Sequence, residues 1–272
     1  MKIKFYGTRG SVPVCDKDFQ EYGGNTSCIL VQNSNGLGIL DAGTGIRQLG
    51  KDLMECQDEI CKQFYLAFSH FHWDHIQGFP FFLPAYHSDH KIIVSVIGKD
   101  SSKLNLQSIL GGQMKHEYFP IPLEQMGANI KFLNVASNEY NTSNFLVKTS
   151  PHNHPGGAHS YRIEADGKAI VYCTDVEHAD GIDKRVVEIA KDADLLIHDS
   201  QYTPEELECK RGWGHSSYTQ AIEVAKLAGV KKLILTHHDP DHNDSFLCEM
   251  EKKCKDLFDD VCLAKEGLTI EV

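Results

Sequence analysis

The feature that most constrains this chain is residues 69–75, where three histidines and one aspartate fall within six consecutive positions, in the pattern H-x-H-x-D-H from His70 to His75. An apolar, aromatic-rich run, residues 63–68, comes directly before it and predicts a buried strand. The donors therefore lie where a strand ends and a loop begins, the usual place for a site in a layered α/β protein. Imidazole and carboxylate donors at this density suit Zn²⁺, Mn²⁺ or Fe²⁺. The alternative, a surface loop that is rich in histidine by chance, explains so specific a pattern poorly.

Composition predicts one globular domain over residues 1–272, because 41% of the residues are apolar. The first residues, Met1 to Gly7, read as a strand and not as a signal peptide, and no run of eighteen apolar residues is present, so we expect a cytoplasmic protein without a membrane span. Nine cysteines without a C-x-x-C pair favour reduced thiols. Of these, Cys28 and Cys173 lie in apolar runs and are predicted core residues.

Net charge is −11. A protein that grips a long polyanion usually presents a basic face. Here the basic residues are scattered, with Lys231-Lys232 and Lys252-Lys253 taken as the basic doublets. The charge therefore argues against a surface that wraps nucleic acid, and against tRNA as a partner. It leaves room for a small phosphate substrate, because bound metal ions can supply positive charge locally.

Hydrophobic periodicity along the chain alternates between strand and helix patterns, which predicts a layered α/β fold. The expected strands cover residues 3–5, 28–31, 38–40, 63–68, 92–97, 130–133, 144–149, 161–165, 168–173, 195–197 and 232–235, with one more at the end of the chain. The expected helices cover residues 46–61, part of 101–127, 182–191, 216–228 and 244–257. Asp166-Gly167 predicts a tight hairpin.

Further metal-binding side chains follow several of these strands. His154 follows the strand at 144–149, Asp175 the strand at 168–173, and His237 or His238 the strand at 232–235, while His198 and Asp199 follow the strand at 195–197. Strands that repeatedly end in histidine or aspartate display a site along one edge of a sheet. On spacing alone, His238 remains an alternative to His237, and His152 an alternative to His154.

The order H-x-H-x-D-H, a lone histidine, an aspartate and then Thr-His resembles the metallo-β-lactamase-fold hydrolases over nearly the whole chain. The resemblance implies a four-layer αββα sandwich with two divalent metal ions at its edge. It implies that one metal is held by His70, His72 and His154, and the other by Asp74, His75 and His237. It further implies that Asp175 bridges the two metals and that Asp41 orients the ligand imidazoles.

Three other segments resemble the ribonuclease Z and cyclic phosphodiesterase branch of that family. Residues 195–201, L-L-I-H-D-S-Q, resemble its "HEAT" motif, with aspartate in the glutamate position. Residues 214–217, G-H-S-S, resemble its "HST" motif, and residues 7–13 resemble its N-terminal segment. The resemblance therefore implies a phosphodiesterase.

The chemistry of such a site assigns three residues to catalysis. Two cations would activate a water molecule for attack on phosphorus. Asp74 would orient this nucleophile and accept its proton. His215 would stabilise the charge that develops or protonate the leaving alkoxide, while Asp199 sets its tautomer.

The predicted substrate is a small, cyclic phosphodiester, such as a cyclic nucleotide or a phosphoribosyl cyclic phosphate. The alternatives are a tRNA 3′-processing endonuclease of the ribonuclease Z kind and, from another class, a non-catalytic metal-binding or regulatory module. Homodimers are common in the family, so a homodimer is also considered. The predicted substrate contacts are Arg9, Asn25, Tyr118 and Phe119. Three other histidines, His116, His178 and His242, are expected to be ordinary surface residues.

Overall fold

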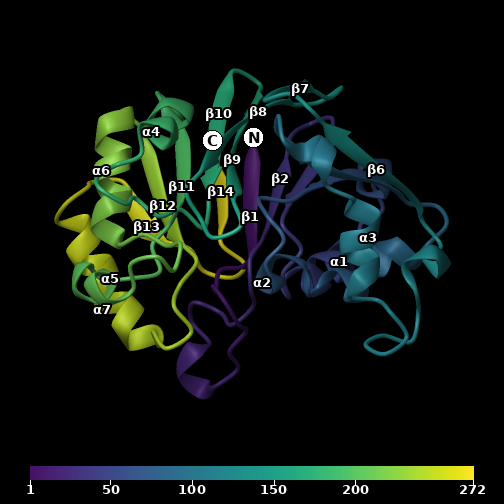
Figure 1. Cartoon of the computed structure of the whole chain (residues 1–272), viewed down its shortest axis with the longest axis horizontal. Coiled ribbons are helices and arrows are strands. Elements are labelled where there is room, and N and C mark those ends of the chain that lie inside the picture. The colour runs from purple at the N-terminus through teal and green to yellow at the C-terminus, as the bar shows by residue number, and fades with distance from the viewer.

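Two seven-stranded sheets form the centre of the computed structural model, which describes residues 1–272 (Figure 1). The strands of the first sheet, in spatial order, are β14 (Thr269–Glu271), β1 (Lys2–Gly7), β2 (Cys28–Gln32), β3 (Leu37–Leu40), β4 (Gln63–Ala67), β5 (Lys91–Ile97) and β6 (Asn129–Val135). Those of the second are β13 (Val261–Leu263), β12 (Lys232–Thr236), β11 (Leu195–Asp199), β10 (Lys168–Cys173), β9 (Ala158–Ala165), β8 (Leu146–His152) and β7 (Glu139–Asn141).

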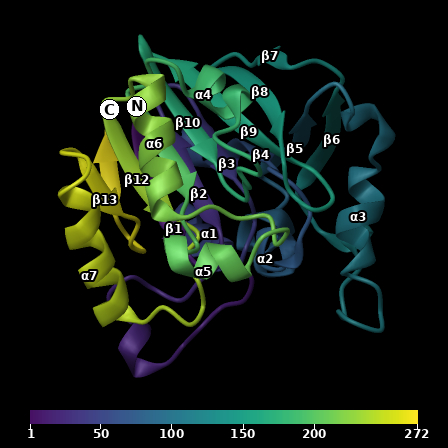
Figure 2. The ribbon, with the colours of Figure 1, turned by 60° about the vertical axis from the view of Figure 1, so that its left-hand side comes forward.

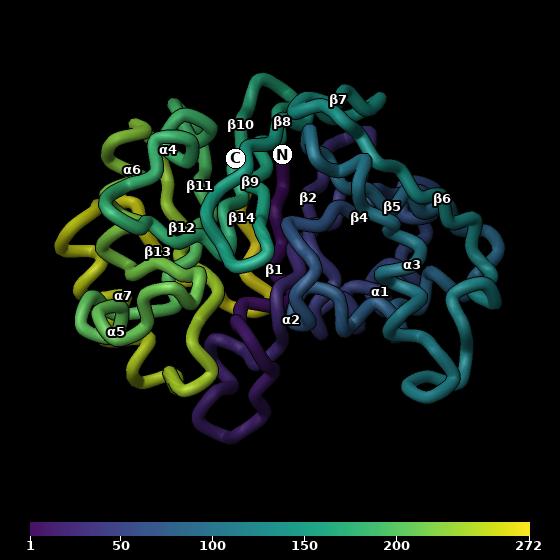
Figure 3. The backbone as a smooth tube through the Cα atoms, in the orientation of Figure 1, coloured from purple at the N-terminus to yellow at the C-terminus, as the bar shows by residue number.

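Helices cover the outer face of each sheet, on opposite sides of the molecule in Figures 1 and 3. The helices beside the first sheet are α1 (Ile46–Glu55), α2 (Trp73–Ile76) and α3 (Leu106–Gly112). Those beside the second are α4 (Lys184–Ala190), α6 (Tyr218–Ala228) and α7 (Asp244–Lys255), with the short α5 (Pro204–Cys209) between β11 and α6. The sequence of layers is therefore helix, sheet, sheet, helix, and the predicted four-layer fold is confirmed.

Alternating side chains explain why each sheet is covered on both faces. On β2, Cys28 and Leu30 point to the helix side, while Ile29 and Val31 point into the core between the two sheets. A strand has a side-chain period of two, so a run that is apolar at every position must be buried on both faces. The prediction that Cys28 and Cys173 are core residues is confirmed, since both are fully buried.

Turn and cap residues fix where several elements begin and end. Asp166 and Gly167 join β9 to β10 with φ angles of 54° and 70°, both positive, as a tight hairpin turn requires. The side chain of Ser217 accepts a hydrogen bond from the amide of Gln220 and so caps the start of α6. That helix ends at Gly229 in the left-handed conformation. No helix is long and apolar enough to cross a membrane.

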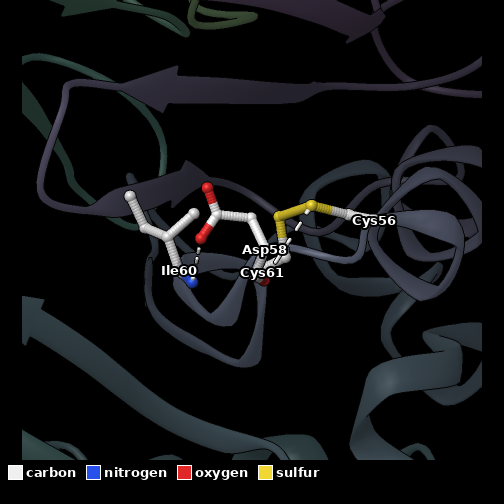
Figure 4. The surroundings of a disulfide bond; sticks show 4 residues. All are labelled: Cys56, Asp58, Ile60 and Cys61. Atoms are coloured by element: carbon white, nitrogen blue, oxygen red, sulfur yellow. Dashed lines mark hydrogen bonds between the residues drawn. A yellow bond between two sulfur atoms is a disulfide. The ribbon is translucent and has the colours of Figure 1, made fainter.

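The helix predicted over residues 46–61 is shorter than expected. It ends at Glu55 and is followed by a disulfide bond between Cys56 and Cys61, whose Cα atoms are 6.3 Å apart (Figure 4). Between them, the Asp58 carboxylate accepts a hydrogen bond from the Ile60 amide and turns the chain back toward β4. The prediction that all cysteines are reduced thiols is therefore wrong for this pair; the other seven are free. The helices α2 and α5 and the strands β7 and β13 were also not predicted.

That residues 1–272 form a single domain stays a prediction. We propose it because one strand from the end of the chain belongs to the sheet that the first half of the chain forms. The first sheet contains strands from the first half of the chain and also β14, from its end. Lys2 of β1 pairs with Glu271 of β14 in antiparallel register. This pairing ties the last residues of the chain to its first strand.

Candidate metal centre

Strand ends bring the predicted donors together. In the first sheet β3 and β4 are parallel, and in the second β10, β11 and β12 are parallel. Asp41 follows β3, His70 follows β4, Asp175 follows β10, Asp199 ends β11, and His237 follows β12. Because the carboxyl ends of neighbouring parallel strands meet at one edge, these residues meet although they are far apart in sequence.

The first group of donors consists of His70, His72 and His154, whose ligand atoms lie within 4.8 Å of one another. His154 Nδ1 lies 2.8 Å from the carbonyl oxygen of Gly214, so that nitrogen carries the proton and donates it. Its Nε2 therefore holds a lone pair, 3.0 Å from His72 Nδ1. His70 Nε2 is buried without a hydrogen-bond partner. A cation is the partner that these facing lone pairs lack.

The second group consists of Asp74, His75, Asp175 and His237, also within 4.8 Å of one another and all buried. His237 Nε2 lies 3.2 Å from an oxygen of Asp74. His75 Nε2 lies 3.3 Å from the same oxygen and has no hydrogen-bond partner in the structure. The group thus offers two imidazole nitrogens and two carboxylates.

The Asp175 carboxylate faces both donor groups. Its Oδ1 lies 3.7 Å from His70 Nε2 and 3.9 Å from His154 Nε2. Its Oδ2 lies 3.1 Å from His75 Nε2 and 3.3 Å from His237 Nε2. Each oxygen of one carboxylate therefore faces one donor group, which is the arrangement that a bridging ligand needs.

Charges in the cluster fit divalent cations. Burial lowers the pKa of His70 well below its usual value, and the neighbouring His75 lowers it further. For His75 burial acts in the same direction, but Asp175, Asp74 and Asp41 outweigh it and raise the pKa well above its usual value. The carboxylates thus demand a positive charge in a buried place, and imidazole and carboxylate donors are those that Zn²⁺, Mn²⁺ and Fe²⁺ accept.

Asp41 is placed to orient an imidazole, as the resemblance implied. Its Oδ2 lies 2.8 Å from His75 Nδ1, and it also accepts hydrogen bonds from Ser69 Oγ and Tyr172 OH, each at 2.8 Å. A carboxylate at Nδ1 fixes the proton there and directs Nε2 toward Asp175. Asp41 has a φ angle of 60°, Asp175 of 54° and His237 of 63°, so three residues of the cluster adopt the left-handed conformation.

The two alternatives left open by the sequence lie outside the donor groups. His238 Nε2 lies 2.9 Å from the carbonyl oxygen of Ala264, and burial next to Arg9 lowers its pKa to about 3. His152 lies between Ser160 Oγ, at 2.8 Å from Nδ1, and the carbonyl oxygen of Asp175, at 3.0 Å from Nε2. The geometry therefore favours His237 and His154 as ligands, and gives His152 a role in holding Asp175.

His215 and Asp199 form a buried pair next to the two donor groups. His215 Nδ1 lies 2.8 Å from Asp199 Oδ2, and its ring stacks on His237 with 5.0 Å between centroids. Asp199 also accepts hydrogen bonds from the amides of Asp175, Gln201 and Ser216. These bonds fix the carboxylate and hence the imidazole. Asp175, Asp199, His215 and His237 also lie within 4.8 Å of one another, so a metal role for the pair competes with a catalytic one.

The structure does not support the predicted substrate contact of Arg9. Its side chain is fully buried, and it donates hydrogen bonds to the carbonyl oxygens of Gly23, at 2.7 Å, and His242, at 2.7 Å. The guanidinium is therefore used to hold two loops together. Asn25 likewise donates its side-chain amide to the Glu266 carboxylate at 2.9 Å. Both residues were predicted from loop position, which does not reveal what a side chain meets.

Other predicted positions divide into exposed and buried residues. Tyr118 is exposed, and Phe119 packs edge-on against Phe81 with 5.5 Å between centroids, so their substrate contacts stay predictions. His116 is exposed, as predicted. The prediction is wrong for His178 and His242, which are buried because they pack against other aromatic rings.

Backbone contacts from the N-terminal loop were missed. The amide of Ser11 donates a hydrogen bond to Asp74 Oδ2 at 2.8 Å. A Cβ atom on Gly10 would lie 2.5 Å from the His237 ring, so only glycine fits there. The Gly-flanked loop was the only indication of these contacts in the sequence. Hydrogen bonds from backbone amides cannot be predicted from residue type.

Gly214 provides a first test of the cluster. Its φ angle is 94°, and an added Cβ would lie 2.2 Å from His154 Nδ1. We expect Gly214→Ala to displace His154 and to weaken metal binding about 10- to 100-fold, as measured by competition with a chelator. The matched control is Gly212→Ala, which has a φ angle of 84° in the same loop but nothing within 4 Å of an added Cβ. Equal metal affinity of the two variants would contradict the assignment of His154.

Fold and site together define a class, the αββα metallohydrolases with histidine and aspartate donors at the sheet edge. A family model described as "Beta-lactamase superfamily domain" matches residues 39–238, and the chain belongs to this superfamily. The ribonuclease Z of Rippkaea orientalis is 34% identical over 109 residues, which cover 39% of this chain and 33% of that protein. The match thus spans about a third of the length of that relative. The ribonuclease Z of Methanosarcina acetivorans is 24% identical over 320 aligned positions, covering 100% of this chain and 98% of that protein.

Solved structures agree on the fold. YhfI from Bacillus subtilis, a metallo-β-lactamase fold protein, has a TM-score of 0.73 at 20% identity, covering 100% of this chain and 98% of its own. The short form of human tRNase Z has a TM-score of 0.69 at 19% identity, covering 100% and 99%. The predicted membership of the metallo-β-lactamase fold is confirmed. The predicted resemblance to ribonuclease Z agrees with the ribonuclease Z relatives named above.

The prediction that tRNA is an unlikely partner is wrong. It rested on net charge, and relatives named ribonuclease Z match this chain over its whole length. Net charge averages over the whole surface, whereas phosphates are bound locally. The chain also contains the basic doublets Lys184-Arg185 and Lys210-Arg211. The second of these begins five residues before His215.

Proposed function

We propose that this protein is a metal-dependent phosphodiesterase that cleaves precursor tRNA on the 3′ side, as a ribonuclease Z. The observation that carries the proposal is the Asp175 carboxylate, whose two oxygens face two separate groups of donors. The full-length similarity to ribonuclease Z proteins supports RNA as the substrate.

Two divalent cations are the proposed cofactors, with Zn²⁺ first and Mn²⁺ or Fe²⁺ as alternatives. The first would be held by His70, His72 and His154, the second by Asp74, His75 and His237, with Asp175 shared. When bound, such cations lower the pKa of water and offset the charge of phosphate oxygens.

The chain's own side chains supply orientation and proton transfer. Asp74 is buried, and the Ser11 amide holds its Oδ2 at 2.8 Å, so this carboxylate is fixed as an acceptor for the proton of an attacking water. The Asp199 carboxylate holds the proton of His215 on Nδ1, which leaves Nε2 as the reactive nitrogen. A protonated Nε2 would stabilise a phosphate oxygen or donate a proton to the leaving ribose oxygen.

The proposal is tested with the metal-loaded protein and a precursor tRNA that carries a 3′ trailer. We expect one cut at the trailer, resolved on a sequencing gel, and loss of cleavage after dialysis against a chelator, with recovery when Zn²⁺ or Mn²⁺ is returned. Mature tRNA without a trailer is the matched control and should stay intact. If a cyclic mononucleotide were hydrolysed while the precursor stayed whole, the proposed substrate would be wrong.

A further inference from the structure

Residues 210–214, here called the tryptophan loop, connect α5 to His215 and are held in one conformation. The Glu177 carboxylate accepts the amide of Gly212 at 2.7 Å and the amide of Gly214 at 2.8 Å. The Trp213 amide donates to the carbonyl oxygen of Lys210 at 3.1 Å. The loop is thus fixed by a buried carboxylate at the edge of the metal centre.

Within this fixed loop the Trp213 side chain is 60% exposed. The ammonium of Lys210 lies 4.5 Å from the centre of its ring, and Arg211, two residues before Trp213 in the loop, is also exposed. An exposed indole adds little to folding stability, because burial is what makes an aromatic side chain stabilising. An exposed aromatic ring with one cation over it and a second cation in the same short loop has the composition of a platform for a nucleobase and its phosphate.

The second tryptophan, Trp73, lies next in sequence to a member of the first donor group. It is 78% exposed and follows His72 in sequence. His72 Nδ1 is 3.0 Å from His154 Nε2, and His154 Nδ1 is 2.8 Å from the Gly214 carbonyl oxygen. In Figure 2 the loop between α5 and α6 extends toward α2, where Trp73 begins the helix. Each of the only two tryptophans of the chain is therefore the sequence neighbour of a residue in this row of contacts, Trp73 of His72 and Trp213 of Gly214.

We propose that Trp213, with Lys210 and Arg211, stacks an unpaired base of the RNA beside the cleaved phosphate, and that Trp73 stacks a second base near His72. This proposal rests on the proposed function in taking RNA as the ligand. It requires an unpaired base, because bases within a duplex already stack on one another. A ribonuclease that cuts next to a 3′ trailer meets single-stranded RNA at that point.

Tryptophan fluorescence tests the stacking directly. Trp73→Phe leaves Trp213 as the sole tryptophan, and Trp213→Phe leaves Trp73. We expect a single-stranded RNA of about twelve nucleotides to quench the emission of each variant, since base stacking quenches indole. A duplex RNA of the same length is the control and should quench little. Emission that the single strand leaves unchanged would overturn the proposal.

Affinity separates stacking from charge. Binding is measured by fluorescence anisotropy of the labelled single strand, and a gel checks that the RNA stays intact. Trp213→Leu should bind the RNA about tenfold more weakly than the original protein, and Trp213→Phe should bind it within about threefold. Trp213→Leu should keep the salt dependence of binding, whereas Lys210→Gln should reduce its slope by about 0.7. Leu227→Ala on α6 removes an equally exposed apolar side chain, 60%, and should bind as the original protein does.

The outcomes distinguish this proposal from the proposed function. If precursor tRNA is cleaved and Trp213→Leu leaves both KM and RNA affinity unchanged, the stacking proposal is wrong and the proposed ribonuclease activity is supported. If the single strand binds and quenches the emission of Trp213 but no precursor tRNA is cut, the stacking proposal is supported and the proposed tRNA cleavage is wrong. If no RNA binds, the platform is wrong.

Discussion

Replacing Asp175 with asparagine is expected to lower phosphodiester hydrolysis by about a thousandfold or more and to reduce the bound metal. The reason is that one carboxylate faces both donor groups, at 3.1 to 3.9 Å from four imidazole nitrogens. An amide carries no charge and presents one oxygen, so it cannot face both groups with equal donors. Metal per chain is measured by elemental analysis after gel filtration, and hydrolysis with bis-p-nitrophenyl phosphate.

The matched control for this variant is Asp194→Asn. Asp194 is also largely buried, with 10% of its side chain exposed, and it pairs with Lys231 at 2.7 Å, away from the donor groups. We expect this variant to keep its metal and its activity. Asp175→Asn with the metal content of the original protein would contradict the shared carboxylate, whatever its activity.

Replacing His215 with alanine is expected to lower kcat by about 10²- to 10⁴-fold while the metal content stays unchanged. His215 is held by Asp199 at 2.8 Å and lies beside His237, and it belongs to neither of the two proposed ligand sets. Its loss should therefore remove charge stabilisation or proton transfer and leave the cations in place. The measurements are metal content and single-turnover cleavage of precursor tRNA.

His116→Ala is the control for His215→Ala, because His116 is an exposed histidine away from the cluster. It should cleave at the original rate. A fall in metal content in His215→Ala would instead make His215 a ligand, as its proximity to Asp175, Asp199 and His237 also permits. Asp199→Asn should lower kcat as well, because an amide can favour the wrong tautomer of His215.

Local patterns were sufficient for most of the fold and the donors. The strand at 28–31 and the hairpin at Asp166-Gly167 depend on neighbouring residues, so the sequence predicted them. His70 to His75 lie in one segment, and the convergence of Asp175 and His237 follows from the parallel order of β10, β11 and β12. His154 follows β8, which is antiparallel to β9 as β9 is to β10, so β8 runs in the same direction as β10 and ends at the same edge.

What could not be predicted depends on contacts across the fold. Arg9 reads as a cation in a loop, yet three-dimensional packing places it against backbone carbonyl oxygens, which no residue pattern records. The Cys56–Cys61 bond depends on where α1 ends, and the periodic pattern extended that helix too far. The net charge of −11 did not indicate the two cations of the tryptophan loop, because a total over the whole chain does not report local pairs of basic residues.

The left-handed backbone at Asp41, Asp175 and His237 links folding to the supply of metal. Residues other than glycine avoid this conformation, at about 1 kcal/mol or more each, and here three of them place carboxylates and an imidazole in a buried cluster. Cation binding would offset that cost, because a ligand that binds only the native state stabilises it by mass action. Bound cations would then raise the stability of the folded chain, as well as support its activity.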